Sequence, residues 1–111
     1  MRNDVTAKWG YVVVWEFRAA AGAERRFEDA YGPRGTWARL FATGEGFIAT
    51  ELNRDLKDPT RYLTLDFWES REAYEAFLAR HAAEYAAMDR ECEALTAEEK
   101  ALGAFERIVT V

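Results

Sequence analysis

The sequence predicts an α+β fold with the order strand, helix, strand, strand, helix, strand. Three observations support this prediction. Apolar and aromatic residues alternate in three short segments, as in strands. Two longer segments place apolar residues three and four positions apart, as in helices. An aspartate–proline turn, Asp58-Pro59, separates the second and third strand segments.

The first strand is expected over residues 9–18, "WGYVVVWEFR". Trp9, Tyr11, Val13, Trp15 and Phe17 alternate with Gly10, Val12, Val14, Glu16 and Arg18. Both faces are therefore largely apolar, which indicates a strand that is covered on both sides. A helix follows, and the "GPRG" segment at residues 32–35 interrupts it before a short helical stretch that carries Trp37, Leu40 and Phe41.

The second and third strands are expected over residues 47–54 and 62–69, joined as a hairpin through "LKDPT". Ser70 is a plausible N-cap for one long amphipathic helix that runs to about Leu95. Thr96 and Glu99 have capping-box spacing and predict one more helical turn, after which Gly103 leads into a last strand, "AFERIVTV". This order is the split βαβ, or ferredoxin-like, arrangement with an antiparallel sheet, and it predicts a single domain over residues 1–111 with its core at about 10–110.

Composition limits the possible functions. The chain of 111 residues has sixteen aromatic side chains and a net charge of −5, which argues against binding to nucleic acid. A single cysteine indicates a reducing compartment. The start of the sequence has no apolar stretch of signal-peptide length, and no window approaches the roughly 18 apolar residues that a membrane span needs. These features lead us to expect a soluble cytoplasmic protein with no membrane partner.

The third strand has two contrasting faces. Leu63, Leu65 and Phe67 lie on one face, and an apolar sheet face without helices is most simply buried against a second copy. We therefore expect a homodimer whose sheets stack face to face. Tyr62, Thr64, Asp66 and Trp68 share the other face, which we assign to the helix side of the sheet.

Polar groups beneath a helical layer must be hydrogen-bonded or hydrated, so this face predicts a small cavity between sheet and helices. The alternative is that Tyr62, Thr64 and Asp66 bond to backbone or solvent while Trp68 fills core volume. Asp66 has two interpretations of its own. Burial beside aromatic rings would raise its pKa and suit it to acid–base chemistry, whereas an arginine partner would make it half of a structural ion pair. The candidate partners are Arg18, Arg54, Arg61 and Arg107.

His81 is the single histidine, and Glu84 is the one acidic residue near it at helical spacing, so no metal site made by the protein is expected. His81 could act as a base or as an axial ligand to a cofactor, or be a surface or capping residue. Cys92 lies in the apolar helical stripe and is interpreted as a core residue. Nucleotide-binding and nucleophile motifs such as GxGxxG, the P-loop, GxSxG and CxxC are absent from the sequence.

The segments "RYLTLDFWESREAYEAF" and "EYAAMDRECEALTAEEKALGAFE" resemble the antibiotic biosynthesis monooxygenase family of dimeric α/β barrels, over about residues 10–109. The resemblance implies a ferredoxin-like monomer, dimerisation through the sheets and a hydrophobic pocket between sheet and helices. Characterised members oxidise polycyclic phenols or anthrones to quinones with molecular oxygen and without flavin, haem or metal. Trp68 stands where those oxygenases have a tryptophan, and Thr64 stands where they have an asparagine.

The function that this resemblance implies is cofactor-independent oxidation of a planar aromatic substrate. Trp68, Asp66 and Thr64 would be catalytic: Trp68 would stack on the substrate, Thr64 would donate a hydrogen bond to its oxygen, and Asp66 would assist deprotonation. Tyr62, Trp37, Tyr85 and His81 are candidate substrate-binding residues. One alternative is a haem-degrading branch, in which Trp68 and the iron ligand His81 would take part, although the first strand lacks that branch's asparagine. A second alternative is a non-catalytic barrel that binds a small aromatic ligand.

Overall fold

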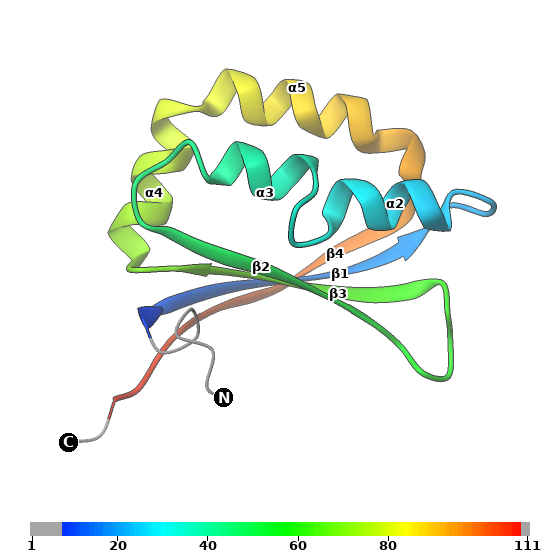
Figure 1. The fold of residues 1–111 in the computed structure, drawn as a ribbon, viewed down its shortest axis with the longest axis horizontal. Coiled ribbons are helices and arrows are strands. Elements are labelled where there is room, and N and C mark those ends of the chain that lie inside the picture. Colours follow the sequence, from blue (N-terminus) through cyan, green and yellow to red (C-terminus); the bar gives the residue numbers. More distant parts are fainter. Residues whose placement is uncertain (1–7, 110–111) are drawn as a thin grey trace.

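The computed structural model describes residues 8–109, which form one four-stranded antiparallel sheet with helices on one side (Figure 1). The sheet order is β2-β3-β1-β4, and each neighbouring pair is antiparallel. This arrangement confirms the predicted α+β, ferredoxin-like fold. In chain order the elements are β1 (Tyr11–Ala19), α2 (Glu24–Tyr31), α3 (Thr36–Phe41), β2 (Phe47–Arg54), β3 (Arg61–Trp68), α4 (Arg71–Arg80), α5 (Ala82–Cys92), the 3-10 turn η1 (Glu93–Leu95) and β4 (Thr96–Glu106).

The predicted interruption of the first helix is present as the break between α2 and α3. Gly35 begins α3 as its N-cap, and a Cβ atom at this position would lie 2.4 Å from the carbonyl oxygen of Asp29. Only glycine therefore allows the chain to pass this close to the end of α2. The turn directs the side chains of Trp37 and Phe41 into the core, where both are buried.

Two predicted boundaries are wrong. The long helix begins as expected at Ser70, whose Oγ accepts a hydrogen bond from the Ala73 amide at 3.1 Å, but it is divided at His81. The backbone of His81, with φ −115° and ψ 28°, lies outside the helical region, although no glycine or proline marks the break. The segment that begins at Thr96 is strand β4, not a helical turn, because it pairs with β1 along residues 11–19.

The two faces of the sheet differ as the alternation predicts. Figure 1 shows the helices α2 to α5 above one face, and none of these four lies on the other face, which we call the helix-free face. Tyr62 packs against Phe27 of α2, and Trp68 packs against Phe77 of α4. Thr64 and Asp66 face a space that residues of α3 and α5 also line. All four are buried, and their assignment to the helix side is therefore confirmed. The helix-free face carries apolar residues that align across strands, among them Val14 with Leu65, and Phe105 with Val12.

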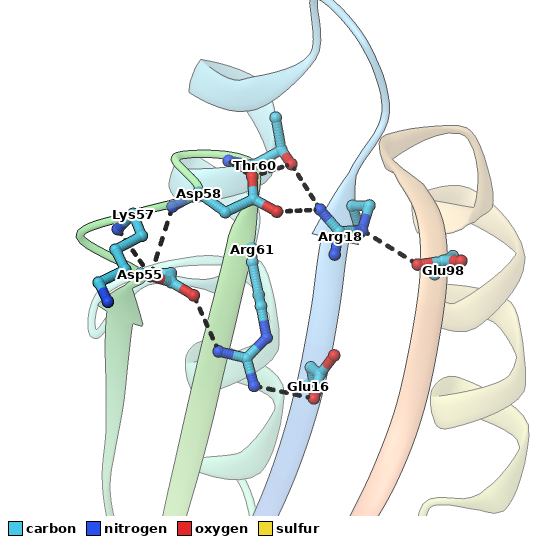
Figure 2. A network of polar contacts seen from close by, with 8 residues as sticks. All are labelled: Glu16, Arg18, Asp55, Lys57, Asp58, Thr60, Arg61 and Glu98. Carbon is cyan, nitrogen blue, oxygen red and sulfur yellow. Dashed lines mark hydrogen bonds and ion pairs between the residues drawn. The ribbon is translucent and has the colours of Figure 1, made fainter.

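The hairpin end of the sheet carries a network of paired charges, shown in Figure 2. Arg18 lies between two acids: it forms an ion pair with Asp58 and another with Glu98 at 3.0 Å. Arg61 bridges Asp55 at 3.0 Å and Glu16 at 3.1 Å. These contacts connect β1, β4 and the β2–β3 turn, so they fix the hairpin against the rest of the sheet.

None of the helices within residues 8–109 is long and apolar enough to span a membrane.

Candidate functional site

A cavity of about 50 Å³ lies between the sheet and helices α3 and α5. Its floor comes from the strands β1, β2, β3 and β4, and its walls come from the helices. Aromatic rings make most of the lining, and three carboxylates are the charged groups. The lining residues are Trp15, Phe17, Tyr31, Trp37, Phe41, Thr50, Thr64, Asp66, Tyr85, Asp89 and Glu99.

Asp66 is the polar centre of this cavity. It lies on β3 opposite Thr50 of β2, and its side chain is only 8 % exposed. The Thr50 hydroxyl donates a hydrogen bond to Oδ1 of Asp66 at 2.7 Å. Burial raises the pKa of Asp66 to about 6, and the hydrogen bond from Thr50 opposes that increase only in part. A carboxyl group with such a pKa can take up or release a proton near neutral pH.

Among residues 8–109, no arginine forms an ion pair with Asp66, so the interpretation of Asp66 as half of an ion pair with Arg18, Arg54, Arg61 or Arg107 is wrong. The candidate partners bind elsewhere: Arg18 pairs with Asp58, Arg61 with Asp55, and Arg54 with Glu28 at 2.8 Å. Arg107 lies over the ring of Trp9. Among residues 8–109, no lysine, arginine or histidine lines the cavity. Asp66 therefore keeps its raised pKa.

Thr64 lines the same cavity and lies two residues before Asp66 on β3. It is buried on β3 directly opposite Trp15 of β1, which also lines the cavity. Residues two apart on a strand point to the same face, so Thr64 and Asp66 present a hydroxyl and a carboxyl group to one space. This is the pair of polar groups that the sequence predicted.

Trp37 of α3 and Tyr85 of α5 form the wall above these groups. Their rings are in edge-to-face contact, with centroids 5.0 Å apart, and both line the cavity as predicted. Nε1 of Trp37 is buried, and the Tyr31 hydroxyl and the Cys92 thiol lie near it. Neither of them, nor any other group within residues 8–109, forms a well-aligned hydrogen bond with Nε1. An unsatisfied buried donor is costly, and a ligand oxygen could satisfy it.

Trp68 and Tyr62 share the strand face of Asp66 but do not line the cavity. Trp68 is fully buried in an aromatic cluster with Phe41 and Phe77, at ring distances of 5.8 and 5.3 Å. Since Phe41 lines the cavity, Trp68 supports its wall from behind. Tyr62 is at the opposite end of β3, and its hydroxyl donates to Oε2 of Glu28 at 2.6 Å.

His81 also lies outside the cavity. Its ring stacks on Phe77 with centroids 5.1 Å apart, and Nδ1 is 3.4 Å from Glu84. It lines a separate surface hollow between the start of β2 and α4. The ring of Phe77 contacts both Trp68 and His81, so it lies between these two candidate residues, and they do not line one common pocket. Within residues 8–109, no group of three or more His, Cys, Asp or Glu side chains could hold a metal ion.

The sequence interpretation missed several lining residues. Thr50 could have been found by counting back from the hairpin turn, because that register sets it opposite Asp66. Trp15 and Phe17 were on the correct face of β1 but gave no sign of lining a cavity. Glu99 was placed in a helical turn, and its position on β4 was therefore missed. Asp89 is one of several charged residues on the exposed surface of α5, and nothing in the sequence distinguishes it from them as a residue of the cavity lining.

The comparison with protein families gives a match over residues 10–88 to antibiotic biosynthesis monooxygenases. The chain belongs to this family. The match includes β1, β2 and β3, and therefore Asp66, Thr64 and Thr50, as well as α5 up to Met88. Asp89 and Glu99 lie beyond the matched segment. A comparison of this chain with curated proteins finds no match.

Solved structures share the fold. SnoaB, a cofactor-independent oxygenase from Streptomyces nogalater, aligns with a TM-score of 0.71 and 23 % identity over 93 % of this chain and 97 % of its own. SO0527 from Shewanella oneidensis aligns with a TM-score of 0.64 and 18 % identity over 93 % of this chain and 95 % of its own. PA3566 from Pseudomonas aeruginosa aligns with a TM-score of 0.62 and 18 % identity over 91 % of this chain and 96 % of its own.

Proposed function

We propose that this protein is a cofactor-independent monooxygenase that oxidises a phenol or anthrone to a quinone with molecular oxygen. The observation that carries the proposal is the buried Asp66 carboxyl group, whose pKa is raised to about 6 and beside which residues 8–109 place no cationic side chain. A base of this kind, facing aromatic rings in a small cavity, suits removal of a proton from an aromatic carbon acid or phenol. Membership of the family supports the same reaction class.

The proposed reaction needs only the substrate and oxygen. Asp66 takes the proton from the anthrone methylene carbon, and the resulting carbanion supplies electrons to O₂. A carbon–oxygen bond forms, and the proton held by Asp66 completes a hydroperoxide. Loss of water from the hydroperoxide then gives the quinone carbonyl, so one oxygen atom of O₂ enters the product and the other leaves as water.

The other lining residues would orient the substrate and stabilise its anion. In this proposal the Thr64 hydroxyl donates a hydrogen bond to the substrate oxygen, on which negative charge accumulates after deprotonation. Trp37 and Tyr85 contact the ring faces, with Nε1 of Trp37 as a second donor. Trp68 keeps the position of Phe41 and acts without touching the substrate.

Substrate binding must enlarge the cavity. Its volume of about 50 Å³ is well below the roughly 300–1,000 Å³ of typical ligand pockets. The contact between Trp37 and Tyr85 crosses from α3 to α5, so these rings must separate for a planar ring to reach Asp66. Helix α5 has a single buried residue, Cys92, and is therefore the wall that can move at least cost.

We also propose a homodimer through the helix-free face. Phe105 is 53 % exposed there, and partly exposed Val14, Leu63 and Leu65 extend the apolar surface across the sheet. Replacing Phe105 and Leu65 together with glutamate should give a monomer in sedimentation velocity. Leu56→Glu is the control, because Leu56 is fully exposed in the hairpin turn, outside this surface. A wild-type protein that sediments as a monomer would refute the dimer.

The test of the reaction is oxygen uptake with a three-ring anthrone in the presence of a metal chelator. We expect Asp66→Asn to lower the rate on the order of 100-fold, the usual contribution of a positioned base. Asp29→Asn, an exposed aspartate on α2, is the matched control and should keep the wild-type rate. Trp68→Phe should have a smaller effect than Asp66→Asn, since Trp68 does not line the cavity.

The wild-type rate should rise with pH across about pH 6, as Asp66 ionises, and then reach a plateau. Uptake no faster than the spontaneous reaction would reject the oxygenase function for this substrate class. An Asp66→Asn variant with full activity would reject the role of Asp66 as the base.

A further inference from the structure

We propose that the cavity also catalyses a reaction that needs no oxygen, namely the interconversion of the keto and enol tautomers of a planar aromatic ketone, with Asp66 moving the proton at carbon. The inference rests on the proposed function in taking the same cavity and the same base. It goes beyond that function because no electron leaves the substrate, so the protein would act as a tautomerase whenever oxygen is absent.

The tautomerisation is balanced without a second reactant. The Asp66 carboxylate takes a proton from the carbon atom that is conjugated with the carbonyl group, so a C–H bond breaks and an O–H bond forms. The electron pair moves through the ring to the carbonyl oxygen, which takes a proton from water when the enolate is released. Asp66 then gives its own proton to water. The reverse steps convert the enol into the ketone.

The surroundings of Asp66 suit both directions of this proton transfer. The Thr50 hydroxyl donates a hydrogen bond to Oδ1 of Asp66 at 2.7 Å, and within residues 8–109 no other group donates to this carboxylate. Oδ2 therefore remains for the proton of the substrate. Because burial raises the pKa of Asp66 to about 6, both of its protonation states are populated close to neutral pH. The same group can thus take up a proton from carbon and give it back.

The cavity can also stabilise the enolate that lies between the two tautomers. Thr64 lies two residues before Asp66 on the same face of β3, and both side chains line the cavity. A ring that presents its acidic carbon to Asp66 can therefore present its oxygen to the Thr64 hydroxyl. Trp37 of α3 brings a second donor, Nε1, to the lining. Fixed donors among aromatic side chains stabilise a developing oxyanion more than water does.

The other titratable groups around the cavity are less suited to move this proton. Three phenols stay protonated near neutral pH because burial raises their pKa values: Tyr31 on α2, Tyr74 on α4 and Tyr85 on α5. Within residues 8–109, β1, β2 and α3 contribute no titratable side chain to the lining. Asp89 of α5 and Glu99 of β4 are the other two carboxylates. Burial raises the pKa of Glu99 as well, so Glu99 is the alternative base that the experiment must exclude.

The experiment follows anthrone in D₂O under argon, so that no oxidation takes place. Two rates are measured: deuterium incorporation at the methylene carbon, by NMR, and conversion of added anthranol, the enol tautomer, into the ketone, by absorbance. The second rate detects proton return to carbon even if Asp66 keeps the proton that it removed. We expect the wild-type protein to accelerate both reactions above their spontaneous rates.

The variants assign this acceleration to named groups. Asp66→Asn should lower both enzymatic rates on the order of 100-fold, because the base is lost. Thr64→Val should lower them by about tenfold, because one hydrogen bond to the charged oxygen is lost while the base remains. The enzymatic rate of deuterium incorporation should rise across about pH 6 in the wild type, and this dependence should vanish in Asp66→Asn. Asp29→Asn is the matched control with an exposed aspartate and should keep the wild-type rates.

The inference is overturned if neither rate exceeds the spontaneous one, if Asp66→Asn keeps the wild-type rates, or if Glu99→Gln abolishes them while Asp66→Asn does not. Acceleration under argon that depends on Asp66, without oxygen uptake in air, would support the tautomerase and reject the oxygenase. Oxygen uptake in air without any acceleration under argon would support the oxygenase and reject the tautomerase.

Discussion

Asp58 and Asp66 lie eight positions apart, in and after the same hairpin turn, yet their environments are opposite. Asp58 forms an ion pair with Arg18 and accepts hydrogen bonds from the amide and hydroxyl of Thr60 (Figure 2). The contact with Arg18 is the main reason why the pKa of Asp58 falls to about 2. Within residues 8–109, the Thr50 hydroxyl is the one group that donates a hydrogen bond to the Asp66 side chain, and burial raises the pKa of Asp66 to about 6.

The difference shows where this protein keeps an uncompensated charge. At the hairpin, every carboxylate drawn in Figure 2 has a cation within reach, so the network holds the strands together. Hydrogen bonds within the network lower the pKa values of Glu16, Asp55 and Asp58. In the cavity, burial without a cation lowers stability and leaves a group that can accept a proton. Such a cost is typical of functional sites.

The largest expected effect is on stability, through removal of the Asp66 charge. The folded-state pKa of about 6 exceeds the unfolded value of about 3.9, so the folded protein binds more protons between pH 4 and 6. Wild-type stability should therefore fall as pH rises through this window and remain lower above it. Asp66→Asn keeps an acceptor for Thr50 and should be more stable than wild type above pH 6, by about 3 kcal/mol at most.

Urea unfolding of both proteins at pH 4 and pH 8 measures this difference. The advantage of Asp66→Asn should be nearly absent at pH 4. Asp29→Asn should show no comparable pH dependence, because Asp29 is exposed. A wild type that gains stability between pH 4 and 6 relative to Asp66→Asn would show that the carboxylate has a partner that lowers its pKa.

A second, smaller effect should follow from removing the hydroxyl of Thr50. Thr50→Val preserves shape but removes the single hydrogen-bond donor to Asp66, so the pKa of Asp66 should rise above about 6. Stability at pH 8 should fall by about 1–3 kcal/mol, since a buried acceptor loses its partner. Thr50→Ser is the control. NMR titration of the Asp66 carboxyl carbon tests the direction, and an unchanged pKa in Thr50→Val would remove Thr50 from the site.

The sequence predicted the fold because each strand carries a clear alternation with period two. The same alternation placed Thr64, Asp66 and Trp68 beneath the helices. It did not show how far along the strand a cavity extends. Asp66 faces the open centre, whereas Trp68, two positions later, lies where Phe41, Phe47 and Phe77 fill all the space. Sharing a strand face is therefore weaker information than sharing a cavity.

Glu99 was missed as a residue of the cavity lining for a different physical reason. Thr96 and Glu99 satisfy a local capping pattern, but the backbone of Thr96 is extended because β4 completes the sheet beside β1. Strand pairing, a long-range interaction, overrides a local helix preference. It also turns Glu99 towards the cavity, opposite Phe17. This residue of the cavity lining was thus missed because the predicted secondary structure of its segment was wrong.

The smallest effect should come from the well-compensated partner in the comparison. Asp58→Asn removes one acid from a network that is partly open to solvent, so we expect the melting temperature at pH 7 to fall by only a few degrees.

With a folded pKa of about 2 and an unfolded one of about 3.9, Asp58 stabilises the protein above pH 4, and this contribution is lost as pH falls towards 2. The gap between wild type and variant should therefore close on acidification. Its sign is opposite to that of the Asp66 gap, because Asp58→Asn should be less stable than wild type at neutral pH whereas Asp66→Asn should be more stable. Calorimetric melting of both proteins between pH 2 and 7 measures it. A gap that stays constant down to pH 2 would mean that the charge pairing of Asp58 with Arg18 does not stabilise the protein, because the amide oxygen of the Asp58→Asn variant can still accept the hydrogen bonds from Thr60. The contrast between the two aspartates would then not be one of charge.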